Sequence, residues 1–566
     1  MSFDRHHLRW NGWGRTSDSF DLGKHEDEVW DWLRGAVGLD AFADRPACAL
    51  ADVVMPEPRL PDGVLSRLRS IVSDGGLKVD AYERVFHARG RSYPDLLALR
   101  SGQVDPAPDA VVYPGTEAHV VELVALAHEC GFALVPFGGG TSVVGGVTSM
   151  PGPDHCGVVT LDTTRLDRVL SIDEESLTAR VQAGIYGPML EQQLQARGFT
   201  LGHYPQSFEF STVGGWIAAR GAGQQSGRYG KAEEWLVSAN VATPRGLWTT
   251  EGFPASAAGP SVGHLIAGGE GALGIITEAT VAIHRVPEET DYRGYLFREF
   301  ADAVSATREI MQQGLPVAMV RVSDADESHF LQRFSHLRKP PGAVQRVADD
   351  LLDRTGWGQG RAMMLVGIEG ERENVRAAHS RTSSIVRRHR AFPLGQSAGH
   401  SWYRGRFALP YLRDPLLDRG VAVDTLETST EWANLHALHD KVTNAIRGAL
   451  ERERATPAAR AMVMCHVSHC YADGASLYFT FIFPQKADGA REQWETVKRA
   501  ACEAIVDGGG TISHHHGVGT DHAPWLRREK GEIGYRLLRA IKDDLDPSGV
   551  LNPGKLLVND SEPPSD

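Results

Sequence analysis

The chain has 566 residues, of which 42% are hydrophobic and 23% charged, and a formal net charge of −13. This length exceeds one hydrophobic core, so we expect two or three domains, and the acidic balance argues against a nucleic-acid binder. The six scattered cysteines argue against a disulfide framework, and the lack of a long apolar run or an apolar N-terminal segment argues against a membrane span and a signal peptide, so we expect a cytoplasmic enzyme.

Residues 1–100 have a mixed, partly helical pattern that we interpret as a lead-in to the first domain. Its unusual feature is the segment Trp10-Asn11-Gly12-Trp13-Gly14, because two tryptophans so near a terminus normally dock onto the body of a protein. We interpret this segment as a structural anchor. From residue 101 to about 290, helical and β-branched segments alternate, which predicts a mixed α/β domain.

The most informative stretch is the loop Pro136–Val147, whose centre is Gly138, Gly139, Gly140, Thr141 and Ser142. Apolar spacing predicts a helix over 120–130, and 133–136 reads as a short strand. The composition of the loop suits neither element, but glycine permits positive φ and close approach of a ligand to the backbone. Consecutive N–H groups in such a turn form an anion-binding nest. We therefore predict that this loop holds a diphosphate, since a flexible linker would be less apolar.

Two common nucleotide motifs do not describe this loop. It lacks the Gly-Lys-Ser/Thr of a mononucleotide P-loop. A formal GxGxxG occurs at Gly269–Gly274, but a dinucleotide fingerprint follows a strand and opens a helix, whereas this one precedes the β-branched run Ile275–Val281. We therefore reject a Rossmann domain. Two further glycine-rich stretches lie at 211–215 and 221–230.

Residues 291–500 predict a second domain, with helices at 301–313, 372–389 and 432–452 and strands at 317–322, 361–367, 462–469 and 476–483. The cluster Cys465-His466-Val467-Ser468-His469-Cys470 has the composition of a metal site. Strict alternation along a strand would place Cys465 and His469 on one face and His466 and Cys470 on the other. This alternation would split the ligand set, so we expect no metal here.

The last segment carries three consecutive histidines at the end of a predicted strand over 511–516. On a strand at most two of them share a face, so we expect no zinc site here either. An amphipathic helix is predicted over 533–545, stopped by Asp546-Pro547. The residues from about 558, rich in Ser, Pro and acid, are expected to be disordered.

These segments carry a family resemblance that covers nearly the whole chain. PFGGGTSVVGG at 136–146, PQSFEFSTVGGW at 205–216 and GGEGALGIITEATVAI at 268–283 resemble the FAD-binding domain of the vanillyl-alcohol oxidase (PCMH) type. Within that superfamily, RWNGWG at 9–14, YLRD at 411–414 and HHHGVG at 514–519 are similar to the alkyldihydroxyacetonephosphate synthase family. The resemblance implies an α+β fold with the FAD-binding domain at 101–290, an α+β substrate domain at 291–500, and a C-terminal segment at 501–566 that returns to the flavin.

The resemblance also implies non-covalent FAD, since no histidine stands at a family position for a flavin bond. The first loop would enclose the diphosphate, and the later glycine segments would surround the ribityl chain and the isoalloxazine ring. One departure is Gly269, where the family usually carries Ser. The implied FAD contacts are Pro136, Gly138, Gly139, Gly140, Thr141, Ser142, Pro205, Ser211, Thr212, Gly214, Gly215, Gly221, Gly227, Glu270, Gly271, Gly274, Ile275 and Ile276.

The implied reaction is a redox-neutral exchange, in which a fatty alcohol replaces the acyl chain of acyl-dihydroxyacetone phosphate to give the alkyl ether, a step of ether-lipid synthesis. The alternative is an FAD-dependent dehydrogenase or oxidase of a 2-hydroxy acid or another alcohol. Such enzymes of this superfamily typically carry GDGN-x-His and GEHG, where this chain has Tyr478 and His515. These replacements remove groups expected to bind metal or to accept the hydroxyl proton, and so favour the exchange. A third hypothesis, a flavin-binding protein without catalysis, leaves the retained His, Tyr and Arg residues unexplained.

The exchange needs a base and an acid. Imidazole suits a base near neutral pH, and His516 is the first candidate, with His515 and His514 beside it. Tyr478 would supply the phenolic proton of a general acid.

The substrates also determine which further groups and partners are expected. The substrate phosphate and the leaving carboxylate call for guanidinium forks, and Arg413 and Arg321 match the functional arginines of the family. A fatty alcohol and an acylated substrate imply contact with a membrane surface, for which the basic helical face at 381–390 is a candidate. A homodimer is also compatible with the sequence. The excess of Arg over Lys among the 59 basic residues suggests a bacterial host.

Overall fold

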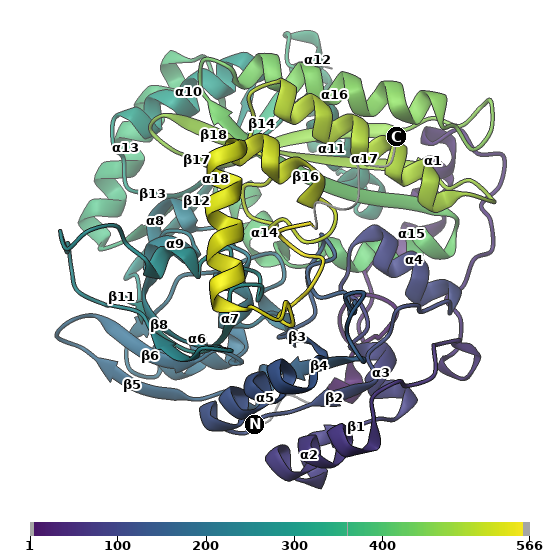
Figure 1. Cartoon of the computed structure of the whole chain (residues 1–566). Helices are drawn as coiled ribbons and strands as arrows, with labels where there is room; N and C mark the ends of the chain where they lie inside the picture. The colour runs from purple at the N-terminus through teal and green to yellow at the C-terminus, as the bar shows by residue number, and fades with distance from the viewer. Residues whose placement is uncertain (1–4, 359, 559–566) are drawn as a thin grey trace.

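The computed structural model describes residues 5–358 and 360–558. Helices and strands are mixed along the described chain, which confirms the predicted α+β class. In Figure 1 most of the chain before β12 forms the lower part of the molecule, and the chain from β12 to α17, together with the purple helix α1, lies above it. The yellow C-terminal helix α18 (Ala523–Leu545) runs along both parts.

The lower part contains two main sheets, whose strands are β1 (Leu77–Lys78), β2 (Ala110–Val112), β3 (Ala133–Phe137), β4 (Val158–Asp162), β5 (Val169–Asp173), β6 (Thr178–Gln182), β8 (Leu236–Thr243), β9 (Gly246–Thr249) and β10 (Ile275–Ala282). The first sheet has the order β1-β2-β4-β3, with β2, β4 and β3 parallel. The second is antiparallel, with the order β5-β6-β10-β8-β9. The short strands β7 (Phe199–Thr200) and β11 (His284–Arg285) pair separately.

Apolar helix faces cover these sheets. The helices of this part are α2 (Asp62–Val72), α3 (Ala81–Phe86), α4 (Tyr93–Ser101), α5 (Glu117–Cys130), α6 (Gly187–Gln195), α7 (Val213–Ala218), α8 (Ser226–Tyr229) and α9 (Ala232–Trp235). Helices α2 and α5 pack on the first sheet, and α6 and α7 pack on the second. The α5 helix begins after the capping side chain of Thr116 and ends at Gly131, whose φ of 70° favours glycine.

The predicted helix and strand before the glycine loop are therefore confirmed as α5 and β3. β3 runs directly into the loop, and the later segment at 268–274 runs directly into β10. Both glycine-rich segments thus lie at strand ends of neighbouring sheets, where backbone can reach a ligand.

The upper part is built on one antiparallel sheet of order β15-β12-β14-β13-β17-β18-β16, with β12 (Glu289–Phe297), β13 (Val317–Ser323), β14 (Ala362–Gly370), β15 (Phe392–Gly395), β16 (Val421–Glu431), β17 (Met462–Cys470) and β18 (Gly474–Pro484). One face packs against α10 (Phe300–Gln312), α13 (Arg372–Arg388), α16 (Leu435–Arg452) and α17 (Ala490–Asp507). Because side chains alternate along each strand, the other face is left to line a cavity.

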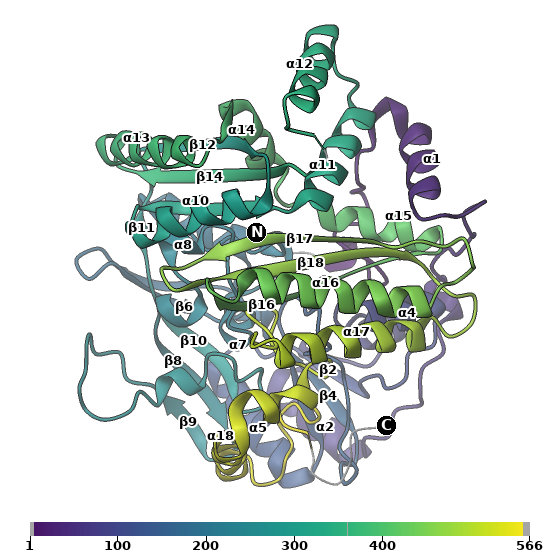
Figure 2. The ribbon, with the colours of Figure 1, turned by 90° about the horizontal axis from the view of Figure 1, so that it is seen from above.

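The remaining helices surround the edges of this sheet and are α1 (Glu26–Ala36), α11 (Ala325–Arg338), α12 (Ala343–Arg354), α14 (Gln396–Gly405) and α15 (Arg413–Asp418). Side chains of α1, α11 and α15 form one apolar cluster with strands β16, β17 and β18. Figure 2 shows α12 projecting away from the rest of the molecule. No helix in the described ranges has the length and apolarity needed to cross a membrane.

Both ends of the described chain are tied to its middle. The backbone N–H of Trp13 donates to Asp414 at 2.9 Å, and a Cβ on Gly12 would lie 2.2 Å from the same carboxylate. The tryptophan segment therefore docks on YLRD, as an anchor would. At the other end, the N–H of Leu134 in β3 donates to Val550 O at 2.7 Å. The expected disorder from about 558 concerns residues outside the described ranges.

Candidate active site

A cavity of about 480 Å³ lies between the two parts of the molecule. Three glycine-rich segments line one side, and the free face of the upper sheet lines the other. Seventeen of the predicted FAD contacts line it, and Gly227 does not. In α8, a Cβ on Gly227 would lie 3.0 Å from Ala318 O, so this glycine serves the packing of α8 on β13. Of the predicted catalytic and substrate residues, Arg321, Arg413, Tyr478, His515 and His516 line the cavity, and His514 lies behind them.

The loop after β3 has the features of an anion nest. Within the described part of the chain, the backbone N–H groups of Gly139, Gly140, Thr141, Ser142 and Val143 have no hydrogen-bond acceptor. Gly140 has a φ of 69°, and a Cβ on Gly139 would lie 1.7 Å from Phe210 O. The hydroxyl of Thr212 is buried and unpaired. Five free amides in one loop fit a diphosphate, and the adjoining glycine segments leave room for the rest of FAD.

A buried ion cluster, which no sequence motif indicated, supports this loop from behind. Arg5 donates to Gly138 O and to the carboxylate of Asp162, which also contacts His87 at 2.8 Å. Burial opposes the charge of Arg5, but Asp162 raises its pKa above the ordinary value. The N-terminal segment therefore fixes the position of the nest through one arginine.

Glu270 connects the third glycine segment to the HHHGVG turn. Its carboxylate accepts hydrogen bonds from the N–H groups of Val518 and Gly519. Burial raises the pKa of Glu270 to about 7, although those two donors act in the opposite direction. Gly269, the departure from the family pattern, lines the cavity beside it.

The three consecutive histidines do not lie on a strand, so that prediction is wrong. The N–H groups of His514, His515 and His516 all donate to the carboxylate of Glu427, a fully buried residue of β16, and the hydroxyl of Ser513 donates to it as well. One carboxylate that binds three successive amides requires a turn, because strand amides alternate in direction. These donors and the nearby imidazoles hold the pKa of Glu427 well below its ordinary value against the effect of burial.

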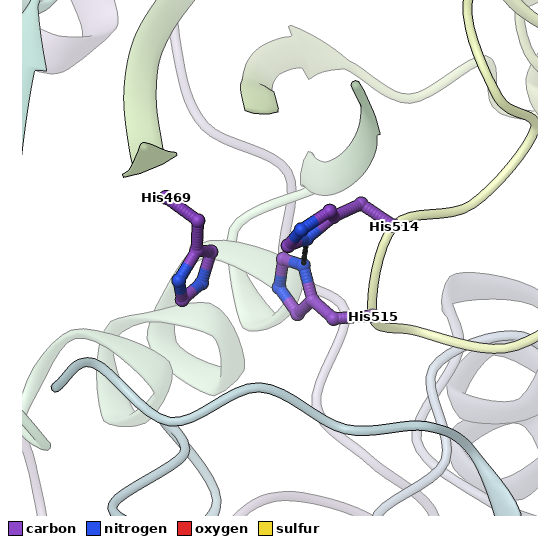
Figure 3. A group of neighbouring side chains, drawn as sticks. All are labelled: His469, His514 and His515. Carbon is purple, nitrogen blue, oxygen red and sulfur yellow. Dashed lines mark hydrogen bonds between the residues drawn. The ribbon is translucent and has the colours of Figure 1, made fainter. Parts of the chain in front are cut away.

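The turn brings His514 and His515 next to His469 of β17, as Figure 3 shows. One ring nitrogen from each of the three lies within 4.8 Å of the others. The Nδ1 atoms of His514 and His515 are 3.0 Å apart, and Tyr471 Oη contacts His514 Nε2 at 2.7 Å. Both reasons given above against a shared metal face are therefore wrong, and this group of imidazoles has the composition of a transition-metal site.

The expected alternation of side chains along Cys465–Cys470 is interrupted by a β-bulge. The register between β17 and β18 shifts between Val467 and Cys470, and one extra residue reverses the alternation of side chains. As a result, His466 and His469 both line the cavity, whereas Cys465 and Cys470 both belong to the core on the helix side.

Tyr478 and His466 form the floor of the cavity and belong to a row of side chains that crosses three strands. Tyr478 in β18 lies directly opposite His466 in β17 and Glu427 in β16. Its ring stacks on His466 with centroids 4.9 Å apart and meets His516 edge-on at 5.5 Å. Burial raises the pKa of Tyr478 to about 12 and lowers those of His515 and His516. The phenol therefore keeps its proton, and the two imidazoles are neutral near pH 7.

The two predicted arginines occupy different sides of this floor. Arg413, the first residue of α15, is half-buried, and the loss of water around its guanidinium lowers its pKa. Its Nε has no acceptor among the described residues. Arg321 of β13 donates to Glu327 Oε1 at 3.0 Å. Both guanidiniums face the cavity and can bind anions there.

Beyond the polar row, the cavity becomes apolar. Successive pairs along β16 and β18 change from Glu427 opposite Tyr478 to Thr425 opposite Thr480 and then to Val423 opposite Ile482. At about 3.3 Å per residue this change takes about 13 Å. We call the apolar end the apolar wall; it consists of Phe330, Leu331, Leu409, Leu412, Leu416, Val423, Met464 and Ile482. Its apolar composition suits a hydrocarbon chain.

Four polar residues of this site were not identified as site residues from the sequence: Glu327, Glu427, His466 and His469. Both histidines stood in the Cys465–Cys470 cluster, whose richness in imidazole was a signal. The alternation rule excluded that signal because a bulge is not visible in a single sequence. Nothing in the local sequence distinguishes the two glutamates from surface carboxylates.

Comparison with protein-family models gives two matches in this chain. Residues 108–251 match the family described as "FAD binding domain", and residues 286–556 match "FAD linked oxidases, C-terminal domain". The first range contains the nest, and the second contains the sheet, the histidine turn and Arg413.

The chain is also similar to proteins of known name. Alkyldihydroxyacetonephosphate synthase of Dictyostelium discoideum is 34% identical over 97% of this chain and 93% of its own length. A solved structure of an alkyldihydroxyacetonephosphate synthase superimposes with a TM-score of 0.82 at 31% identity, covering 97% of this chain and 98% of the other. The 4-ethylphenol oxidase of Gulosibacter chungangensis shares the fold, with a TM-score of 0.66 at 16% identity over 89% of this chain and 99% of its own.

Proposed function

The chain belongs to the alkyldihydroxyacetonephosphate synthase family, and from this we propose that it replaces the acyl chain of acyl-dihydroxyacetone phosphate by a fatty alcohol. FAD is its cofactor. The observation that carries the proposal is that one cavity combines a diphosphate nest, two arginines, a Tyr–His floor and an apolar wall. A phosphate ester that bears a long hydrocarbon chain needs each of these surfaces.

The residues that hold FAD are the free amides of residues 139–143, with Thr212 and Glu270 nearby. When bound, FAD would supply an electron-poor isoalloxazine ring to the exchange. The chain itself supplies binding, orientation and proton transfer. No metal is assigned to the reaction.

His516 is the base that takes a proton from the carbon next to the carbonyl. Burial lowers its pKa, so the ring is neutral and able to accept a proton near pH 7. The N–H donated to Glu427 fixes the backbone of this residue, and His515 lies beside it with ring centroids 4.6 Å apart. Tyr478, whose phenol stays protonated, gives a proton to the carbonyl oxygen as charge develops there.

The two arginines bind the two anions of the reaction. The Nε atom of Arg413 is buried and unpaired among the described residues, so a bound anion would accept the hydrogen bond that water no longer accepts. We assign the substrate phosphate to Arg413 and the leaving carboxylate to Arg321. The carboxylate leaves with both of its oxygens, and its chain lies along the apolar wall.

The test uses acyl-dihydroxyacetone phosphate and a chain-labelled fatty alcohol, incubated anaerobically with the FAD-loaded protein. We expect a labelled ether product and one free fatty acid per turnover, with no reduction of an added electron acceptor. Reduction of the acceptor by a 2-hydroxy acid, without ether formation, would instead support the dehydrogenase alternative and refute this proposal.

The long-chain substrates also support contact with a membrane surface. We infer that the protein binds phospholipid vesicles reversibly, without a spanning helix in the described ranges. Co-sedimentation with vesicles that contain the acylated substrate measures this contact, and equal recovery in the supernatant with and without vesicles would exclude it.

A further inference from the structure

The proposed exchange includes one proton transfer to which neither His516 nor Tyr478 has been assigned. A fatty alcohol attacks carbon well only when its hydroxyl proton is removed, and the leaving carboxylate has already departed as an anion. The alcohol must therefore meet a base near the start of the apolar wall, where its chain lies. We propose that His466, positioned by Glu327, is the base that deprotonates the fatty alcohol; this inference rests on the proposed function.

His466 and Glu327 form a buried imidazole–carboxylate pair. His466 Nδ1 lies 2.8 Å from Glu327 Oε1, and the two residues are 139 positions apart in the chain. The side chains of both residues are less than one-tenth exposed. Arg321 donates to the same carboxylate oxygen at 3.0 Å. The arrangement is the one in which a carboxylate fixes the ring orientation of a base.

The hydrogen bonding determines which ring nitrogen is free. Nδ1 lies 2.8 Å from Glu327 Oε1 and 3.1 Å from Arg321 Nη2, and that arginine already donates to the same glutamate oxygen. Two unprotonated acceptors at the shorter distance would repel each other, so Nδ1 carries the proton and donates to Glu327. Nε2 then holds a lone pair, and no described residue hydrogen-bonds to it. The ring lines the cavity. Burial and the charge of Arg321 lower the pKa of His466, so the ring is neutral before the alcohol binds.

His466 is placed to take the proton of the alcohol hydroxyl rather than the proton on the substrate carbon. Its ring stacks on Tyr478, which touches the reacting centre, at 4.9 Å. Met464, two residues earlier on the same strand, belongs to the apolar wall, as do Phe330 and Leu331, one helical turn beyond Glu327. A chain lying on this wall brings its hydroxyl to His466, which stacks on the Tyr478 ring, whereas His516 meets the same ring edge-on.

The step balances without any further reactant. The alcohol O–H bond breaks, and its proton moves to His466 Nε2. The carboxylate has left the dihydroxyacetone phosphate carbon and has taken the electron pair of the broken C–O bond with it. The alcohol oxygen uses the electron pair freed from its O–H bond to form a new bond to that carbon. The proton then passes to water, since the fatty acid leaves as its anion. No atom is oxidised or reduced overall.

A comparison of two nucleophiles tests this role. A labelled fatty acid is ionised at neutral pH, so its exchange into acyl-dihydroxyacetone phosphate needs no base for the nucleophile, whereas the alcohol needs one. His466→Asn keeps an amide donor for Glu327 but loses Nε2. We expect alcohol incorporation to fall about 100-fold or more, as for loss of a positioned base, and fatty-acid exchange to stay within about threefold.

The control is His439→Asn. His439 forms a comparable imidazole–carboxylate pair with Asp324 at 3.3 Å, but its ring packs toward Phe479 on the helix side of the sheet and does not line the cavity. We expect both exchange rates to stay near the native values in this variant. FAD content measured by absorbance confirms that each variant is folded.

The same ratio of rates tests Glu327 as a positioning residue. Glu327→Gln should lower alcohol incorporation more than fatty-acid exchange, and Glu327→Asp should restore part of the difference. If His466→Asn loses FAD, the Glu327→Gln ratio decides the question. Equal loss of both exchanges, or no loss of either, would overturn the role of His466. Absence of both exchanges in the native protein would instead refute the proposed function.

Discussion

Gly139→Ala tests the assignment of the glycine loop directly. The added Cβ would lie 1.7 Å from Phe210 O and 2.8 Å from its carbonyl carbon, whereas ordinary contact begins near 3.4 Å. The loop and the 210–212 segment must therefore separate by about 1.7 Å, because both are backbone and cannot rotate away. Such a shift moves the free amides of residues 139–143 out of register with a diphosphate.

The expected loss follows from the hydrogen bonds that the shift breaks. An N–H bonded to a charged oxygen contributes about 1.5–3 kcal/mol. Losing two of the five amide contacts weakens FAD binding by about 3–6 kcal/mol, which corresponds to about 10²- to 10⁴-fold in Kd. The sheets do not depend on this contact, so we expect the apoprotein to remain folded.

The assay is the FAD to protein ratio after gel filtration, followed by titration of the apoprotein with FAD. Gly115→Ala is the matched control, because its Cβ would meet no atom within 4 Å and its φ is not positive. FAD affinity of Gly139→Ala equal to that of the control would show that residues 138–142 do not hold the diphosphate.

Four further predictions follow from the site. Tyr478→Phe removes one hydroxyl while the ring keeps its packing on His466, so we expect turnover to fall about 100-fold with unchanged FAD content. Tyr295→Phe, on the helix face of the same sheet, is the control. Native turnover in Tyr478→Phe would exclude Tyr478 as a proton donor. Acid precipitation should release all FAD into the supernatant, and a yellow pellet would show a covalent bond. Because burial lowers the pKa of His516, the neutral base persists below pH 6.5, and we expect the acid limb of the rate profile to lie below that value; a limb above it would contradict this assignment. Zn²⁺ should bind to His469, His514 and His515 and inhibit the exchange, and a chelator should restore the activity. His469→Gln should abolish the inhibition and keep the activity. Activation by Zn²⁺ would instead show that the reaction uses a metal.

The sequence alone was sufficient for the features that depend on neighbouring residues. The helix before the nest, its strand and the glycine loop follow from apolar spacing and from the absence of a Cβ, and the structure contains α5, β3 and five free amides there. Four strands of the upper sheet, β13, β14, β17 and β18, were predicted from the sequence in the same way, whereas β12, β15 and β16 were not. The cofactor was predicted from the family motifs, because each motif is a short run of neighbouring residues that can be read directly from the sequence.

Only the tertiary structure decided which polar residues meet. Glu427 lies 87 positions before His514, and its carboxylate turns the three histidines away from the strand that their local sequence predicts. The bulge in β17 depends on pairing with β18, and it places His466 and His469 on the cavity side against simple alternation. Glu327 reaches His466 only because α11 packs against β17. A turn, a bulge and an ion pair of this kind gain their stability from partners that are distant in the sequence, so no local pattern specifies them.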